Sequence, residues 1–297
     1  MTLKRFRKRD LADRFMLVLN VFTLVFLGLS YLAGWVSPNQ FWPLAFVGMA
    51  FPIILIMVSL FILYWALRKR WFFFMNVAFL LLRWDYVLAT VNISTSADDS
   101  EDLIEVMTYN VRLFDKYNWS EQQNTSKNIE DFILKEQPDI LCIQEFYSRQ
   151  NAPSKAPNNL LSSPHYKQIH LKNFFAQREN ENDFGIATLT SYPILNKGTI
   201  VLENSRSALT IFTDILIKSD TIRVYNVHLQ SIHLGMNGYQ VLDELLENKE
   251  IQDVKESKLV LALMKKAFTK RAEQAELIAN HISQCPYPII VCGDFND

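Results

Sequence analysis

The chain has 297 residues, of which 49% are hydrophobic and 13% aromatic. This composition excludes a disordered tail, a collagen-like protein and a coiled-coil fibre, and only three cysteines exclude a disulfide scaffold. The formal net charge of −1 conceals an asymmetry, because residues 1–91 contain ten Lys and Arg against three Asp and Glu, whereas residues 92–297 contain 20 against 28. The two parts are therefore expected to face different surroundings.

Residues 1–91 have the composition of a membrane anchor. No charged residue or histidine occurs in the 53 positions from Phe15 to Leu67. A turn-type cluster at residues 37–40 divides this run, which predicts one spanning helix over 15–36 and a second over 41–67. The first apolar stretch is too long for a cleaved signal peptide, and a second span follows it.

A third apolar segment covers residues 71–91 and contains both Arg83 and Asp85. These two residues lie two positions apart, so on a continuous helix they do not face each other. The segment can be a third spanning helix, or a re-entrant or surface helix. Within the second helix, Pro52 is expected to produce a kink.

The distribution of Lys and Arg predicts the orientation of the anchor in a membrane. Six basic residues precede the first span, and Arg68, Lys69 and Arg70 follow the second. We therefore expect an integral membrane protein with a cytoplasmic N-terminus. Three spans would place everything after residue 92 on the non-cytoplasmic side, which is the arrangement we predict, whereas two spans would leave it inside.

Residues 92–103 are polar and acidic and are expected to form a linker. Short apolar or β-branched runs follow, as in strands buried inside a sandwich. The predicted strands are Ile104–Val111, Asp139–Gln144, Tyr166–Leu171, Phe184–Ser191, Gly198–Leu202, Ala208–Lys218, Thr221–Leu229 and Tyr287–Gly293. Residues 148–164 resemble a surface loop. Strands and helices in this order predict an α/β sandwich.

Two helices are predicted, over Asn128–Glu136 and Val254–Ser283. Arg271 and Gln274 lie on the longer helix, where a solvated or structural role is the default. Its apolar stripe is Leu261, Met264, Phe268, Ala275, Ile278 and Ile282. Cys142 and Cys292 fall inside apolar strands and are expected to be core thiols.

Four polar clusters stand where apolar strands end, which is where sites collect in sheet-based folds. They contain Asn110 with Arg112, Gln144 with Glu145, Asn226 with His228, and Asp294 with Asn296. Each cluster alone has an ordinary interpretation as a solvated carboxylate, an Asx-type turn or a structural histidine. Their combination and order are more informative than any single cluster.

These clusters, together with the run Gly185–Ile194, resemble the endonuclease/exonuclease/phosphatase superfamily, which has the deoxyribonuclease-I-like fold. The matching motifs are Asn-x-Arg, Gln-Glu, Asn-Val-His-Leu and Gly-Asp-Phe-Asn. The resemblance covers residues 104–297 and implies a four-layer α/β/β/α sandwich after the N-terminal transmembrane helices. Membrane-attached members are familiar in bacteria, so it implies a bacterial inner or plasma membrane.

The resemblance implies hydrolysis of a phosphoester with Mg²⁺ or Mn²⁺ as cofactor, by in-line attack of water on phosphorus. Glu145 is the expected metal ligand, and Asn110 is expected to offer an amide oxygen to the metal or its water shell. These residue types agree with the preference of Mg²⁺ for oxygen ligands.

The remaining site residues are expected to act on the phosphate and on the attacking water. Arg112 and Asn226 would bind the phosphate. Asp294 would orient or deprotonate the water, and Asn296 would donate to the phosphoryl oxygens. His228 would hydrogen-bond the phosphoryl group or help to protonate the leaving oxygen.

The sequence departs from the superfamily pattern at its end. A further Asp and a Ser-Asp-His motif normally follow the Gly-Asp-x-Asn strand, and neither is present in residues 104–297. We expect these residues to lack the C-terminal part of the domain and to be inactive by themselves. The other interpretation is a protein that lacks half of its acid–base apparatus.

The expected substrate is a phosphoester in a nucleic acid, a nucleotide or a lipid head group. The acidic balance of residues 92–297 argues against tight non-specific binding of a duplex. A lipid bilayer is the expected partner of residues 1–91, and no protein partner is predicted. The alternative function is a catalytically incomplete, membrane-tethered binding module with the same fold.

Overall fold

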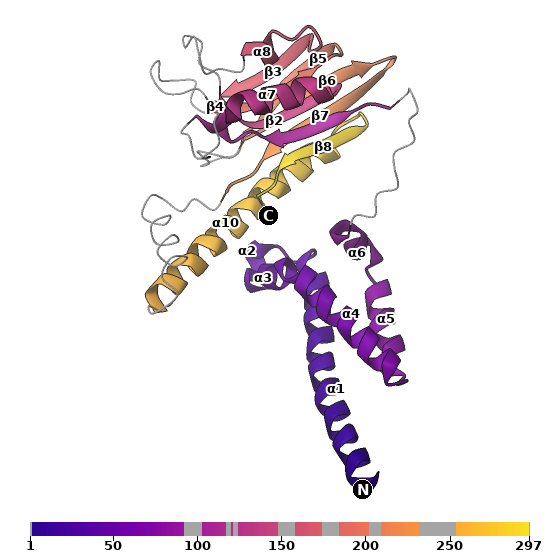
Figure 1. Cartoon of the computed structure of the whole chain (residues 1–297). Coiled ribbons are helices and arrows are strands. Elements are labelled where there is room, and N and C mark those ends of the chain that lie inside the picture. Colours follow the sequence, from indigo (N-terminus) through magenta and orange to yellow (C-terminus); the bar gives the residue numbers. More distant parts are fainter. Residues whose placement is uncertain are drawn as a thin grey trace. The chain divides into compact units, whose positions relative to one another are not determined.

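The protein has a helical first unit and an α/β second unit in the computed structural model (Figure 1). The units are Met1–Asp98 and Asp99–Asp297, and the boundary falls inside the predicted linker. Most of that linker, residues 92–102, lies outside the described residues. The structure describes residues 2–91, 103–116, 120, 124–147, 158–173, 184–201, 209–231 and 254–296.

The first unit is built from helices that contain the predicted apolar segments. One helix, Leu11–Ala33, is long and apolar enough to cross a membrane. In the described residues this number rises to three if each of two bent helix pairs is a single span. The helices are α1 (Thr2–Ala33), α2 (Pro38–Phe41), α3 (Pro43–Met49), α4 (Phe51–Leu67), α5 (Phe72–Leu81) and α6 (Trp84–Thr90).

Both bends have a local cause. Helices α3 and α4 meet at 56°, with Pro52 in the first turn of α4, which confirms the predicted kink. Helices α5 and α6 meet at 76° around Arg83, whose φ and ψ of −136° and 59° are not helical. This break lets Arg83 reach Asp85, with Nε–Oδ1 and Nη2–Oδ2 distances of 3.0 and 2.9 Å. The expectation that the two side chains do not face each other holds only for a continuous helix.

An ion pair joins the start of α1 to the end of α4. Arg68 donates from Nε and Nη2 to the two carboxylate oxygens of Asp13 at 2.8 and 2.7 Å. The Tyr64 hydroxyl also donates to Asp13, at 2.8 Å. Asp13 is buried, so these donors replace the water that its carboxylate would otherwise bind.

A second polar contact lies deeper in the same unit and joins three helices. Asn20 and Asn76 donate to each other's amide oxygens at 2.7 and 3.0 Å. The Trp65 indole N–H donates to Asn20 Oδ1 at 2.8 Å. All three side chains are fully buried, so α1, α4 and α5 are tied together by a saturated polar cluster among apolar neighbours.

The described residues of the second unit form two four-stranded sheets, in the orders β1-β2-β4-β3 and β5-β6-β7-β8. Strand β2 is apolar over most of its length and buried on both faces, as expected for a strand at the centre of a sandwich. The strands are β1 (Val106–Asn110), β2 (Ile140–Tyr147), β3 (Gln168–Asn173), β4 (Phe184–Thr190), β5 (Ile194–Ile200), β6 (Leu209–Ile217), β7 (Asp220–His228) and β8 (Ile289–Asp294).

Alternating side chains divide the core into layers. On one face of β2, Leu141 and Ile143 pack with Ile133 of α7 (Thr125–Glu136). On the other face, Ile140 and Cys142 pack against strands of the second sheet. Beyond that sheet, Tyr225 and Val227 of β7 pack with Ile278 of α10 (Val254–Ser283). The predicted α/β/β/α sandwich is therefore confirmed.

The structure differs from the sequence prediction in the buried side of α10. Leu261 and Ala275 are exposed, whereas the buried positions of this helix among the described residues are Ala267, Arg271, Gln274 and Ile278. The predicted apolar stripe is therefore displaced around the helix. Polar bonds of Arg271 and Gln274, described below, account for the displacement. A short helix, α8 (Asn158–Leu161), also lies within the predicted loop 148–164.

His170 of β3 is buried between the two sheets. Its Nδ1 lies 2.9 Å from the Thr213 hydroxyl of β6. Burial, with smaller contributions from Lys197 and Lys172, lowers the pKa of His170 from 6.5 to about 4. The ring is therefore neutral in the folded protein at pH values where an unfolded chain already protonates it.

This difference predicts that acid destabilises the second unit through His170. The contribution is fully present above pH 6.5 and is lost as the pH falls toward 4, because only the unfolded state then gains a proton. His170→Gln keeps a polar side chain beside Thr213 and should reduce the loss of unfolding free energy between pH 7 and pH 4.5 by roughly 2 kcal/mol. Urea unfolding of the detergent-solubilised chain, followed by circular dichroism, measures this. Parallel pH dependences in both proteins would contradict the assignment.

Candidate active site

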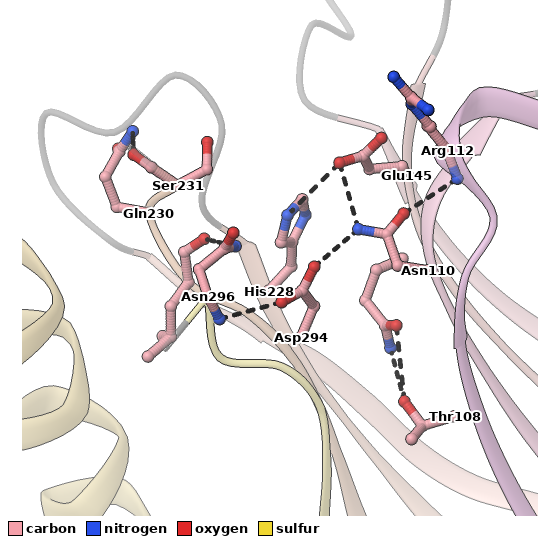
Figure 2. A network of polar contacts seen from close by, with 11 residues as sticks. Thr108, Asn110, Arg112, Glu145, His228, Gln230, Ser231, Asp294 and Asn296 are labelled. Carbon is pink, nitrogen blue, oxygen red and sulfur yellow. Dashed lines mark hydrogen bonds and ion pairs between the residues drawn. The ribbon is translucent and has the colours of Figure 1, made fainter. Parts of the chain in front are cut away.

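Two parallel strand pairs, one in each sheet, bring the predicted residues to one edge of the sandwich. Strands β1 and β2 run parallel, with Asn110 opposite Gln144. Strands β7 and β8 also run parallel, with His228 opposite Asp294. Asn110, His228 and Asp294 each end their strands, and Glu145 directly follows Gln144, the last residue of β2 that pairs with β1. The side chains of Asn110, Glu145, His228 and Asp294 point toward one another (Figure 2).

Glu145 leaves the hydrogen-bonded ladder through a β-bulge. The pairing of β2 with β4 shifts register between Gln144 and Phe146. Glu145 itself has a φ of 52°, a left-handed value uncommon for a residue with a side chain. Its side chain is 31% exposed, whereas Gln144 and Phe146 are buried. The bulge therefore turns this carboxylate out of the core and toward the site.

Asn110 connects the two carboxylates. Its amide nitrogen donates to Glu145 Oε1 at 3.2 Å and to Asp294 Oδ2 at 2.7 Å. Its amide oxygen accepts from the backbone N–H of Arg112 at 2.9 Å. The nitrogen, rather than the oxygen predicted to face a metal, is thus directed at the carboxylates in this structure. A single amide holds acidic groups from both sheets near a common point.

His228 and Asn296 complete the cluster on the side of the second sheet. His228 Nε2 lies 3.9 Å from Glu145 Oε1, and its side chain is only 6% exposed. The backbone N–H of Asn296 donates to Asp294 Oδ1 at 2.9 Å, which gives the Asx-type turn considered from the sequence. The Asn296 amide nitrogen donates to the Leu229 carbonyl at 2.9 Å, next to His228.

A left-handed turn places Arg112. The four residues from Arg112 to Asp115 all have positive φ, between 47° and 55°. Such values are costly for residues with side chains and persist where the surroundings impose them. Phe114 is buried and packs edge-to-face against Phe146 at a ring distance of 5.7 Å. This anchor holds the turn, and Arg112 lies next to Glu145 at the rim of the site (Figure 2).

Gln144 and Asn226 form a buried support beneath the site. Gln144 Nε2 donates to Asn226 Oδ1 at 2.7 Å, across the two sheets. Asn226 Nδ2 in turn donates to the Ala187 carbonyl at 2.8 Å. Asn226 is fully buried, and both ends of its amide are engaged inside the protein. This geometry favours a supporting role over the predicted direct contact of Asn226 with phosphate.

Two residues of α10 also support the site. The Gln274 side-chain oxygen accepts from the backbone N–H of Gln230 at 3.0 Å, and Arg271 Nη1 donates to the Gln230 carbonyl at 3.3 Å. Both side chains are buried, so their predicted structural role is confirmed and a solvated role is wrong. Gln230 follows His228 by two residues. In the sequence, the only indication of this contact was that Arg271 and Gln274 are polar residues on a helix with an apolar side.

The donor set of the site fits a hard divalent cation. Glu145 and Asp294 offer carboxylate oxygens that converge on the Asn110 amide. Mg²⁺ and Mn²⁺ use one or two carboxylates and retain water or substrate oxygens in their other positions. In the described part of the chain, no group of three or more His, Cys, Asp or Glu could hold a metal.

The chain belongs to the Endonuclease/Exonuclease/phosphatase family, whose model matches residues 107–297. Residues 13–90 match a second family model, described as "Domain of unknown function (DUF8431)". No curated protein sequence matches the chain. The first match contains every residue of the site.

Solved structures that are similar to this chain have low sequence identity to it. A humanized D. rerio TDP2 is 14% identical, with 65% of this chain and 62% of that chain covered and a TM-score of 0.41. An endonuclease/exonuclease/phosphatase from Beutenbergia cavernae is 15% identical, with 65% of this chain and 47% of that chain covered and a TM-score of 0.44. The human Nocturnin catalytic domain is 20% identical, with 65% of this chain and 64% of that chain covered and a TM-score of 0.42. The chain thus spans less than two thirds of the length of these structures.

The buried support is expected to matter for stability. Asn226→Leu would leave the Gln144 amide and the Ala187 carbonyl without their present partners, at a cost of roughly 2 to 3 kcal/mol in unfolding free energy. As a matched control, Asn280→Leu makes the same change at an exposed asparagine of α10 and should cost less than about 0.5 kcal/mol. Urea unfolding of both variants gives the comparison. Equal losses of unfolding free energy in the two variants would show that the contact between the sheets does not stabilise the fold.

Proposed function

We propose that this protein is a membrane-anchored phosphoester hydrolase of the phosphodiesterase or nuclease type, dependent on Mg²⁺ or Mn²⁺. The observation that carries the proposal is the contact of Glu145 and Asp294, from different sheets, with one amide nitrogen of Asn110. Acidic groups brought together at the carboxyl ends of two strand pairs, with a buried histidine beside them, are what metal-assisted attack on phosphorus requires. The family match over residues 107–297 supports the same class of reaction.

Glu145 and Asp294 would hold the metal ion, and Asn110 would fix their separation or contribute its amide oxygen after rotation of the amide. When bound, the ion would polarise a phosphoryl oxygen and offset negative charge. The left-handed turn at residues 112–115 would keep Arg112 beside Glu145, where its guanidinium can contact a phosphate oxygen. We propose that Asn226 acts through Gln144, as a positioning residue.

The second sheet would supply the acid–base groups. Asp294 stands at the end of β8, where its carboxylate can orient a water molecule or accept its proton. His228, opposite Asp294 in the parallel register, would hydrogen-bond the phosphoryl group or protonate the leaving oxygen. Asn296 would donate to the phosphoryl oxygens with the amide hydrogen that is not used by Leu229.

A small or flexible phosphoester suits the charge of this part of the chain. Residues 92–297 contain 20 Lys and Arg against 28 Asp and Glu, which opposes tight binding to the backbone of a duplex. A nucleotide, a lipid head group or a single-stranded nucleic acid end makes fewer phosphate contacts. We therefore propose such substrates ahead of double-stranded nucleic acid.

Metal binding tests the site without the need for turnover. Mn²⁺ titrated into the detergent-solubilised chain should bind roughly tenfold or more weakly after Glu145→Gln or Asp294→Asn, as measured by calorimetry. The control Asp220→Asn removes an exposed carboxylate at the β6–β7 turn and should leave binding unchanged. With the whole product of the gene, Mg²⁺ should support hydrolysis of bis(4-nitrophenyl) phosphate and EDTA should abolish it. Either site variant should lower that rate roughly 100-fold or more.

Unchanged metal affinity and unchanged rates in both site variants would defeat the assignment. Metal binding that depends on both carboxylates, with no Mg²⁺-dependent hydrolysis, would instead favour the alternative of a tethered binding module. The two outcomes are separated because binding and hydrolysis are measured independently.

We further propose that the third apolar segment crosses the membrane in the same direction as α1. Contacts between the two segments progress together along the chain. Asn20 pairs with Asn76, and farther along α1 the Tyr31 hydroxyl donates to the Phe79 carbonyl at 3.1 Å. The Tyr31 ring also packs against Tyr86 at 5.8 Å. The residues that follow this segment would therefore lie on the same side of the membrane as the C-terminal end of α1, which is the end far from Asp13.

The basic residues near Asp13 favour a cytoplasmic location for that end of the unit, so residues after 92 would lie outside. Protease added to intact cells should therefore remove a tag at the C-terminal end of the chain. A tag at the N-terminus provides the control and should survive until the membrane is permeabilised. Immunoblotting against both tags gives the readout. Protection of both tags in intact cells would show that the second unit is cytoplasmic.

A further inference from the structure

Two cysteines occupy the inner faces of the opposed sheets, directly below the site. Cys142 lies on β2, two residues after Ile140, and both side chains pack in the cluster between the sheets. Cys292 lies on β8, two residues after Ile290, and both side chains pack against the same cluster. Side chains two apart on a strand share a face, so the two cysteines face each other from separate sheets.

The neighbouring Cys292 thiol, together with burial, raises the pKa of the Cys142 thiol well above its ordinary value. Each thiol also has a second polar neighbour: Cys142 Sγ lies 3.9 Å from the Thr188 hydroxyl, and Cys292 Sγ donates to the Tyr225 carbonyl at 3.7 Å. Cys142 is fully buried, whereas Cys292 is partly exposed. Cys292 is therefore the more accessible member of the pair.

We propose that Cys142 and Cys292 form a disulfide that joins the two sheets. Cys292 would attack a low-molecular-weight disulfide such as glutathione disulfide, forming a mixed disulfide and releasing one thiol. Cys142 would then attack the Cys292 sulfur and release the second thiol. The two protein thiols lose two electrons and two protons, and the reagent's sulfur–sulfur bond gains them as two thiols.

The position of this bond links it to the site. Cys142 precedes Gln144 by two residues, and Cys292 precedes Asp294 by two residues. A covalent bond between them would fix the separation of β2 and β8 immediately below Glu145 and Asp294. It would also close a loop of 150 residues, which restricts the unfolded chain. The topology proposed above places the pair in an oxidising compartment, although the reaction itself does not depend on that topology.

Thiol counting tests the proposal on the purified full chain in detergent. The chain is treated with glutathione disulfide or with dithiothreitol, denatured, alkylated with N-ethylmaleimide and weighed by mass spectrometry. We expect three adducts on the reduced chain and one on the oxidised chain, with a proteolytic peptide that joins Cys142 to Cys292. Three adducts after oxidation, or a linkage that includes Cys285, would overturn the proposal.

Variants separate this pair from the third cysteine. Cys285→Ser is the matched control, because Cys285 lies outside the pair and its Sγ donates to the Tyr287 carbonyl at 3.6 Å. Its oxidised form should carry no adducts and its reduced form two. Cys142→Ala and Cys292→Ala should each carry two adducts under both conditions. Loss of two thiols in either alanine variant would also overturn the proposal.

Thermal unfolding provides a second readout that needs neither metal nor hydrolysis. Oxidation should raise the unfolding midpoint of the chain and of Cys285→Ser by several degrees, and should leave Cys142→Ala and Cys292→Ala unchanged. An equal rise in the alanine variants would contradict the inter-sheet bond. Failure of these tests would leave the metal-binding results unaffected, so the two proposals are judged separately.

Discussion

The parallel pairing of β1 with β2 and of β7 with β8 is the constraint on which the site depends. Parallel neighbours end at the same edge of a sheet, and the two sheets face each other. Residues 184 positions apart, Asn110 and Asp294, can therefore share a hydrogen bond of 2.7 Å. The buried contact between Gln144 and Asn226 keeps the sheets aligned below this point. Without both, the acidic groups would belong to separate surfaces.

Much of this arrangement could be predicted from the order of short motifs. The sandwich follows from apolar strands that alternate with polar loops, and the strand-end position of Asn110, His228 and Asp294 follows from where each apolar run stops. The predicted end of the second strand at Gln144 was too early, because β2 continues through the bulge at Glu145 to Tyr147. Motif order could also indicate that these residues share a site, because the family match covers all of them. The kink at Pro52 was predictable for a covalent reason, since proline lacks the N–H that the helix needs.

The remaining features depend on tertiary contacts that leave no periodic signal. The bulge at Glu145 and the left-handed turn at 112–115 require positive φ values from residues other than glycine. The local sequence therefore does not predict either of them. The buried side of α10 was misjudged because Arg271 and Gln274 bury polar groups against the backbone of Gln230. The Arg83–Asp85 pair likewise required a break in the helix that hydrophobicity alone does not reveal. For α10 and for Arg83, a specific polar bond overrides an average tendency.

The saturated polar cluster of Asn20, Trp65 and Asn76 has a mechanical consequence for the anchor. The three side chains are fully buried among apolar neighbours, so an amide that leaves this cluster would lose its hydrogen-bond partners. Sliding α5 along α1 by one helical turn would break both amide–amide bonds at once. The cluster therefore opposes sliding of α5 along α1 and fixes the axial register of these helices.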